Sequence, residues 1–309
     1  MNHQYSIQVD PRAYQPKTQG LDGGIPLRVH ADPCNREVAG TLRVHNDWSR
    51  CVRPVPGYKG GLGEMVNFIG ACVPECFPER LEIISYANEF AFLYDDAMEE
   101  VLDARPESQN QNQNHNQSRR RDPRTTTPGD TLDGWDALLQ AKQLRLQIVQ
   151  EMAAIDSERA MTTNEAWTKF LTLAAGSRSR PLFTLADIRD DELELCMQLA
   201  RPGYAAISLT NDLYSWDKER EQAQRAGIGY VYNAIWVIMQ EKSVSEEEAK
   251  TMCMREILYN IRRFCELVEM ANRSDWLSWD LKMYLEAVKA SHVGNLVWSI
   301  HCPRYRSVE

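Results

Sequence analysis

Apolar residues recur at helical spacing along most of this chain, and this pattern limits the fold more than any other feature. From Gly61 onward, apolar side chains return every three or four residues, as on a helix with one buried face. The pattern runs through segments 65–72, 81–98, 137–152, 165–175, 192–218, 230–241, 245–272 and 274–299. Clear strand alternation is absent, so the sequence predicts an all-α protein of about ten helices in a single domain over 1–309.

Two stretches interrupt the helical pattern. Residues 1–60 are rich in Pro, Gly and other turn formers, and we expect residues 1–25 to be flexible. Residues 106–130, PESQNQNQNHNQSRRRDPRTTTPGD, are polar and repetitive and cannot contribute to a core. Because helical sequence of similar composition lies on both sides, we interpret them as a disordered insertion loop rather than a boundary between domains.

Charge and cysteine content exclude several classes of protein. The net charge is −9 and the pI is about 5.3, so nucleic acid, which needs a basic face, is not an expected partner. The eight cysteines are scattered without a CxxC pair, which argues against zinc and favours reduced thiols in a cytoplasmic protein. Neither an apolar signal segment nor a run long enough to predict a membrane span is found.

The stretch LYDDAMEEV, residues 93–101, places four acids at the end of an apolar helical run. Asp95 and Glu99 lie one turn apart on the same helix face, with Asp96 beside them. Like charges at this spacing repel one another, and bound cations would neutralise them. A single acidic cluster is usually a solvated helix end, so this stretch alone does not establish a metal site.

A second polar stripe lies in NDLYSWDKE, residues 211–219. Asn211, Ser215 and Glu219 are spaced four residues apart and therefore share one helix face. Their amide oxygen, hydroxyl and carboxylate are hard oxygen ligands that suit Mg²⁺. Apolar helix precedes the stripe, so we expect it at the mouth of a cavity. Together, the two polar faces could hold several Mg²⁺ ions, and these ions could hold a diphosphate.

With these motifs in place, the chain resembles the class I terpene synthases, specifically the cyclase domain of fungal bifunctional terpene synthases. The resemblance rests on DDAME at residues 95–99, NDLYSWDKE at residues 211–219 and the tail HVGNLVWSIHCPRY at residues 292–305. The stretches EMAAID and ARPGYAAISLTNDLYSW, at residues 151–156 and 200–216, add to it. The similarity extends from about residue 27 to residue 305, which is most of the chain.

The resemblance implies a helical bundle around an apolar active-site cavity and a Mg²⁺-dependent reaction with about three ions. A linear prenyl diphosphate, geranylgeranyl (C20) or geranylfarnesyl (C25), would be ionised, and its carbocation cyclised to a di- or sesterterpene. The implied metal ligands are Asp95, Asp96, Glu99, Asn211, Ser215 and Glu219. The implied diphosphate ligands are Lys218, Arg304 and Tyr305. The implied catalytic residues are Asp95, Asn211, Ser215, Glu219, Arg304 and Tyr305.

A carbocation needs a dry cavity with aromatic faces, because the ring quadrupoles stabilise positive charge. We expect Phe68, Phe90 and Trp298 to form part of the cavity wall. For each of them, packing in an ordinary core is an equally good interpretation.

The chain departs from the family pattern upstream of Asn211. A diphosphate-sensing arginine followed by a long apolar helix is expected there, but residues 183–195 read FTLADIRDDELEL, which is short and acidic. Arg178, Arg180 and Arg189 lie nearby without the expected neighbours. A segment near residue 188 is therefore missing from the pattern. This junction predicts, as an alternative function, a diphosphate-binding variant with impaired or lost cyclase activity.

Residues 1–309 contain no prenyltransferase domain with its own pair of aspartate-rich motifs, so we expect the chain to need preformed C20 or C25 diphosphate. A trans-prenyltransferase is a further alternative. It is disfavoured because Asn211, Ser215 and Glu219 stand where a second aspartate-rich motif would be expected. A plain helical interaction module would leave both polar stripes unexplained.

Overall fold

The computed structural model describes residues 3–32, 34–55, 57, 60–103, 132–157, 160 and 190–305. Of these, residues 98–103, 132–139 and 190 are described by their backbone alone. The predicted insertion loop 106–130 and the predicted helix 165–175 lie outside the described residues.

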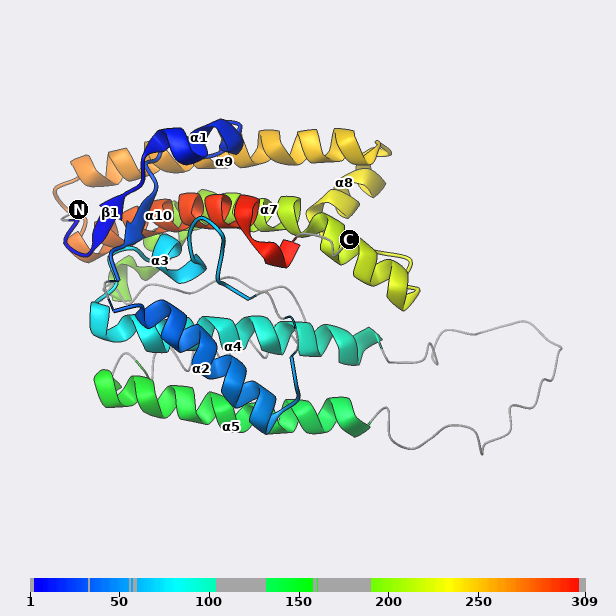
Figure 1. Cartoon of the computed structure of the whole chain (residues 1–309). Coiled ribbons are helices and arrows are strands. Elements are labelled where there is room, and N and C mark those ends of the chain that lie inside the picture. The colour runs from blue at the N-terminus through cyan, green and yellow to red at the C-terminus, as the bar shows by residue number, and fades with distance from the viewer. Residues whose placement is uncertain are drawn as a thin grey trace, which may run out of the picture.

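Two groups of long helices face each other in the molecule (Figure 1). The first group contains α2 (Arg36–Cys51), α4 (Pro78–Asp103) and α5 (Leu132–Ile155). The second group contains α7 (Leu193–Ala226), α9 (Glu246–Arg273) and α10 (Trp279–His301). The short helix α3 (Phe68–Cys72) contacts both α4 and α10 and so joins the groups, and α8 (Ala234–Lys242) connects α7 to α9.

Each group of helices has a core of its own. In the first, Trp48 of α2 meets Phe90 of α4 edge to face, with ring centroids 5.8 Å apart. In the second, Phe264 of α9 and Trp298 of α10 are fully buried. Gly203 allows α7 to approach both neighbours, because a Cβ there would lie 2.8 Å from Phe264 and from Val288.

Side-chain caps define where the helices around the predicted site begin. At the start of α9, Glu248 donates its backbone N–H to the Ser245 hydroxyl, and the Ser245 N–H donates to the Glu248 carboxylate at 3.0 Å. This capping box satisfies two backbone donors at once. At the start of α8, the Asn233 side-chain oxygen accepts from the N–H of Ile235 at 2.8 Å. Helix α7 ends at Gly227, which adopts a left-handed conformation.

The N-terminal segment differs from the flexible stretch expected over residues 1–25. The strands β1 (Ser6–Gln8) and β2 (Arg28–His30) pair antiparallel, and α1 (Pro11–Thr18) lies between them in the chain and contacts α10. Tyr14 is fully buried, and its hydroxyl accepts from the N–H of Leu27 at 2.9 Å. A buried aromatic anchor fixes this segment despite its many turn formers.

The all-α expectation is confirmed, apart from this small sheet. Helix α2 was not predicted from the sequence; it lies within the turn-rich residues 1–60 and buries Val44 and Trp48 against α4 and α5. The predicted helix 230–241 begins four residues later, at Ala234. None of the described helices has a stretch both long and apolar enough to cross a membrane.

Candidate active site

The aspartate-rich motif on α4 meets basic side chains from two distant parts of the chain. Arg304, on the short 3-10 turn η2 (Pro303–Tyr305), donates to both carboxylate oxygens of Asp96 at 2.8 Å. Lys218 of α7 donates to the same carboxylate at 3.0 Å. We call Asp96, Lys218 and Arg304 the Asp96 cluster. The cluster joins the first helix group to the second, and its two-pronged arginine contact fixes the geometry.

The two neighbouring aspartates respond differently to their surroundings. Burial would raise the pKa of Asp96, but the charges and hydrogen bonds of Arg304 and Lys218 hold it below its ordinary value. At Asp95, crowding by protein atoms raises the pKa, and Arg304 only partly offsets this effect. Asp95 is still open to solvent on one side. A cation that reached it there would favour its charged form.

The predicted stripe of Asn211, Ser215 and Glu219 lies on α7, near the Asp96 cluster. The Asn211 amide donates to the hydroxyl of Tyr305 at 2.6 Å, so the stripe contacts the same C-terminal turn that carries Arg304. Glu219 lies two turns further along α7, and one of its carboxylate oxygens accepts from the amide of Asn233 at 3.0 Å. The structure therefore connects the two predicted motifs through Lys218 and η2.

The chemistry of the stripe fits a hard divalent cation. Ser215 is only 2% exposed, and its hydroxyl has no hydrogen-bond partner among the described residues. Buried hydroxyls without partners are rare, and a bound cation would satisfy this one. Among the described side chains, no three carboxylates, imidazoles or thiols gather into a ligand set. A site here would therefore need the amide and hydroxyl oxygens of the stripe.

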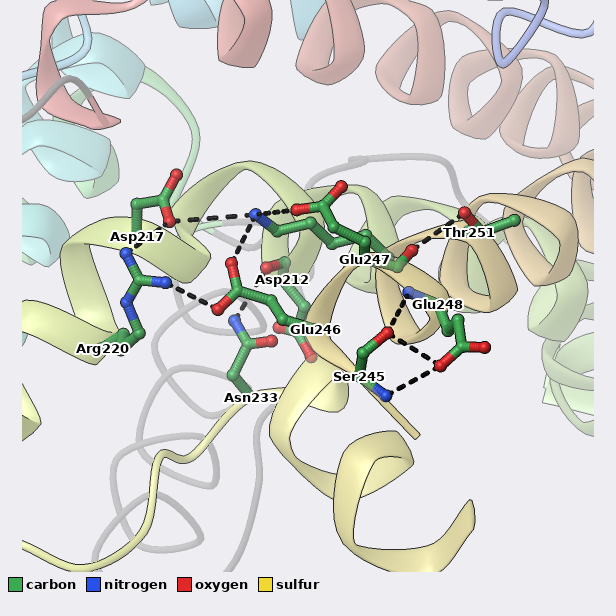
Figure 2. A network of polar contacts seen from close by, with 10 residues as sticks. Asp212, Asp217, Arg220, Asn233, Ser245, Glu246, Glu247, Glu248 and Thr251 are labelled. Atoms are coloured by element: carbon green, nitrogen blue, oxygen red, sulfur yellow. Dashed lines mark hydrogen bonds and ion pairs between the residues drawn. The ribbon is translucent and has the colours of Figure 1, made fainter. Parts of the chain in front are cut away.

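A network of polar contacts fastens α7 to α8 and α9 beside this site. Figure 2 shows Asp217 and Glu246 on either side of Arg220, with contacts of 3.1 Å and 2.6 Å. In the same view, Asn233 lies next to Asp212, whose backbone oxygen accepts from the Asn233 amide at 2.8 Å. Asn233 was not predicted from the sequence. Its place as a helix cap was readable in the sequence, but its contact with Glu219 depends on how α8 folds back.

Four aromatic rings gather next to Arg304. Trp298 stacks on Phe92 at 5.9 Å, meets Phe68 edge to face at 4.8 Å and meets Tyr305 at 5.4 Å. The Arg304 guanidinium lies over the Phe92 ring at 4.8 Å. Phe68 and Trp298 thus lie together as expected. Phe92 was missed, although its position three residues before Asp95 places it on the same helix face.

Other predicted residues lie elsewhere or outside the described part. Phe90 does not join the four rings, because it points into the first core toward Trp48. The side chain of Glu99, the junction FTLADIR and the arginines of residues 178–189 are outside the described residues. A hollow on α9 is lined by Arg255, Leu258, Tyr259, Arg262, Arg263 and Glu266, none of which belongs to either motif. The wall of an active-site cavity stays a prediction.

Known sequences similar to this chain are terpene synthases. The model of terpene synthase family 2, C-terminal metal binding, matches residues 180–263, which include the α7 stripe. The bifunctional type I diterpene synthase tndC of Aspergillus flavipes is 39% identical over 99% of this chain and 42% of its own length. The fusicoccadiene synthase of Phomopsis amygdali is 35% identical over 99% of this chain and 45% of its own. The chain thus spans less than half the length of these relatives.

Solved structures share the fold at low sequence identity. Aristolochene synthase from Penicillium roqueforti superposes with a TM-score of 0.55 and 17% identity, covering 86% of this chain and 94% of that one. Linalool/nerolidol synthase from Streptomyces clavuligerus gives a TM-score of 0.53 and 15% identity, covering 89% and 98%. The matched metal-binding model and the fungal relatives show that this chain is similar, over nearly its whole length, to part of the bifunctional di- and sesterterpene synthases, and it shares the helical fold of solved terpene synthases.

Proposed function

We propose that this chain is a Mg²⁺-dependent terpene cyclase that acts on preformed geranylgeranyl or geranylfarnesyl diphosphate and releases a cyclic di- or sesterterpene. The observation that carries the proposal is the convergence of Arg304 and Lys218, from two different elements, on Asp96 of the aspartate-rich motif. The names of the relatives include both diterpene and sesterterpene synthases, so the proposal keeps both substrate lengths.

Arg304, Lys218 and Tyr305 would bind the diphosphate. Arg304 and Lys218 are held at the mouth of the site by Asp96, and the oxygens of a diphosphate would attract both cations more strongly than one carboxylate does. The Tyr305 hydroxyl accepts from Asn211 and therefore keeps its own proton for donation. Burial raises the pKa of Tyr305, so this proton is retained at neutral pH.

Asp95, Asn211, Ser215 and Glu219 would hold Mg²⁺, with Glu99 and Asp96 as the further predicted ligands. The bound metal would supply Lewis acidity toward the leaving diphosphate. The faces of Phe92 and Trp298, beside Arg304, would lie near the diphosphate end of the prenyl substrate, where positive charge first develops.

Product analysis tests this proposal directly. The purified chain is incubated with Mg²⁺ and either C20 or C25 diphosphate, and a hexane extract is examined by gas chromatography with mass detection. We expect a cyclic hydrocarbon that disappears with EDTA and with Asp95→Ala or Asn211→Ala. A product that forms equally well in EDTA would overturn the metal-dependent mechanism.

A diphosphate-binding protein without cyclase turnover is the second candidate. The short FTLADIRDDELEL junction favours it, because the expected arginine context is missing there. The alignment with the Aspergillus flavipes relative runs over 331 positions, although this chain has 309 residues, so parts of that relative have no counterpart here. Mg²⁺-dependent binding of diphosphate with no hydrocarbon from either substrate would favour this candidate. The matched family model favours both candidates over a trans-prenyltransferase.

A further inference from the structure

Asn233, at the start of α8, donates a hydrogen bond to the carboxylate of Glu219 on α7. It belongs to neither of the two metal motifs. We propose that Asn233 is a positioning residue that fixes Glu219 for the metal ion. The inference rests on the proposed function, because it takes Glu219 as a Mg²⁺ ligand. Asn233 would act only through Glu219, without touching the substrate.

The Asn233 side chain has one possible orientation. Its Nδ2 donates to the Glu219 carboxylate at 3.0 Å and to the backbone oxygen of Asp212 at 2.8 Å, while its Oδ1 accepts from the N–H of Ile235 at 2.8 Å. If the amide oxygen and nitrogen were exchanged, the oxygen would face the oxygens of Glu219 and Asp212, and the NH₂ group would face the N–H of Ile235. The residue is fully buried, so water cannot replace these bonds cheaply. The direction of its N–H toward Glu219 is therefore fixed.

A second contact fixes the distance between the two helices. The Asp212 carboxylate accepts from the backbone N–H of Ala234 at 2.8 Å, directly next to the Asn233 cap. Asp212 and Glu219 lie two turns apart on α7, and both are thus attached to the first residues of α8 (Figure 2 shows Asp212 and Asn233). A shift of α8 along α7 would break both attachments together.

A neutral donor suits this task better than a charged one. The amide occupies one carboxylate oxygen of Glu219 and leaves the other, together with the full negative charge, for a cation. Asp96 shows the contrast, since Arg304 and Lys218 already neutralise its carboxylate. A long, flexible glutamate that is held in advance loses less conformational freedom on metal binding.

The test compares Asn233→Ser with Ser245→Ala in the intact chain. Serine keeps the helix-capping function at position 233 but is too short to reach Glu219. Ser245→Ala removes the cap of α9, also visible in Figure 2, without touching either metal motif. Asn233→Asp is the second variant, because it keeps the cap and replaces the donor with a negative charge. Glu219→Ala reports whether Glu219 binds the metal at all.

The readout is Mg²⁺ affinity measured by isothermal titration calorimetry with inorganic diphosphate present, alongside the thermal unfolding midpoint. We expect Asn233→Ser to weaken Mg²⁺ binding about 10- to 100-fold, Asn233→Asp to weaken it further, and Ser245→Ala to lower only the unfolding midpoint. If Glu219→Ala weakens binding and both Asn233 variants bind as the parent does, the positioning role is overturned while the proposed function stands. If Glu219→Ala has no effect either, the metal assignment of Glu219 fails, and the positioning role fails with it.

Discussion

Arg304 contacts Asp96 through two bonds of equal length, and this geometry is the most demanding single contact of the site. A lysine at the same position would keep the positive charge but could not bind two oxygens in one plane. We therefore expect the positive charge at position 304 to be enough to keep the fold, and the paired hydrogen bonds to be needed for binding the diphosphate. This separation allows the function of Arg304 to be tested without unfolding the protein.

We expect Arg304→Lys to lower kcat/KM for the prenyl diphosphate by about 100-fold or more, with the unfolding midpoint nearly unchanged. Arg225→Lys is the control, because Arg225 is an exposed arginine at the end of the same α7 that carries Lys218. Steady-state kinetics with either substrate length measures the effect. Activity of Arg304→Lys within twofold of the parent would contradict a two-pronged contact with diphosphate.

Glu37 makes stability depend on pH. Its buried carboxylate accepts from the N–H groups of Ile69 and Gly70, and burial raises its pKa from 4.5 to about 7 against these bonds. The folded state therefore binds this proton more tightly than the unfolded chain does, so stability is lost as pH rises from about 4.5 to about 7. His292 acts in the opposite direction, because burial lowers its pKa from 6.5 to about 4.

A difference measurement isolates Glu37 from His292. Relative to the parent, Glu37→Gln should gain about 3 kcal/mol in free energy of unfolding between pH 4.5 and pH 8, because glutamine never becomes charged. Urea unfolding of both proteins across this range gives the difference. A difference that is constant with pH would mean that folding does not change the pKa of Glu37.

The residues that the sequence predicted best are those whose spacing alone defines a helix face. Asn211, Ser215 and Glu219 share a stripe because α7 is regular, and no tertiary information is needed to see it. Phe92 and Phe90 are two residues apart on α4 and face different cores, which depends on the neighbouring helices. Asn233 was missed for the same reason, since its partner Glu219 belongs to another helix.

At the scale of elements, the packing of α3 against α10 supports the aromatic rings. Gly294 of α10 lies against the backbone of Ala71 and Cys72 in α3, and a Cβ there would overlap the Ala71 carbonyl. α3 begins with Phe68 and α10 carries Trp298, so this close approach sets how the two rings meet. The α3 backbone cannot move aside for an added methyl group as a flexible side chain could.

We expect Gly294→Ala to lower the free energy of unfolding by about 1–3 kcal/mol, because it forces α3 away from α10. Gly229→Ala is the matched control, since nothing lies within 4 Å of the added methyl group. Chemical unfolding followed by tryptophan fluorescence compares the two. If both variants lost the same stability, close packing of α3 on α10 would not be the cause.

Elements differ in how much of them the sequence could reveal. The capped helix α9 has a strong amphipathic pattern and a Ser-Glu capping box, so local signals agree with the fold. Helix α2 is also amphipathic, but it follows a Pro- and Gly-rich stretch and carries many polar residues, so the surrounding turn formers hid its helical pattern. The three-residue strands are too short for a visible alternation.

In the molecule as a whole, the two predicted metal motifs belong to different helix groups. The aspartate-rich motif lies on α4 in the first group, and the stripe lies on α7 in the second, with Lys218 and Arg304 reaching across (Figure 1 shows the two groups). Sequence periodicity predicts each helix but does not say which helices share a core. A ligand bound by both motifs would therefore stabilise the association of the groups.

We expect Mg²⁺ together with inorganic diphosphate to raise the free energy of unfolding by about 2.7 kcal/mol at a ligand concentration 100 times its Kd. Differential scanning calorimetry would show this as a higher unfolding midpoint that EDTA removes. Mg²⁺ alone should give a smaller change, because Arg304 and Lys218 then keep their contacts with Asp96 and gain no diphosphate oxygens. If sodium chloride at the same ionic strength raised the unfolding midpoint as much as Mg²⁺ with diphosphate does, the cause would be a general salt effect.

Asp96 and Arg304 are 208 positions apart in the chain, and Asp96 and Lys218 are 122 apart. We expect contacts over such separations to form late in folding, because the entropy cost of closing the long loops comes before the contacts can stabilise the chain. The proposed diphosphate site would therefore be incomplete in a nascent or half-folded chain, and a ligand would bind only after these contacts have formed. Ligand should consequently slow unfolding while leaving the refolding rate unchanged, which makes the finished protein long-lived without helping it to form.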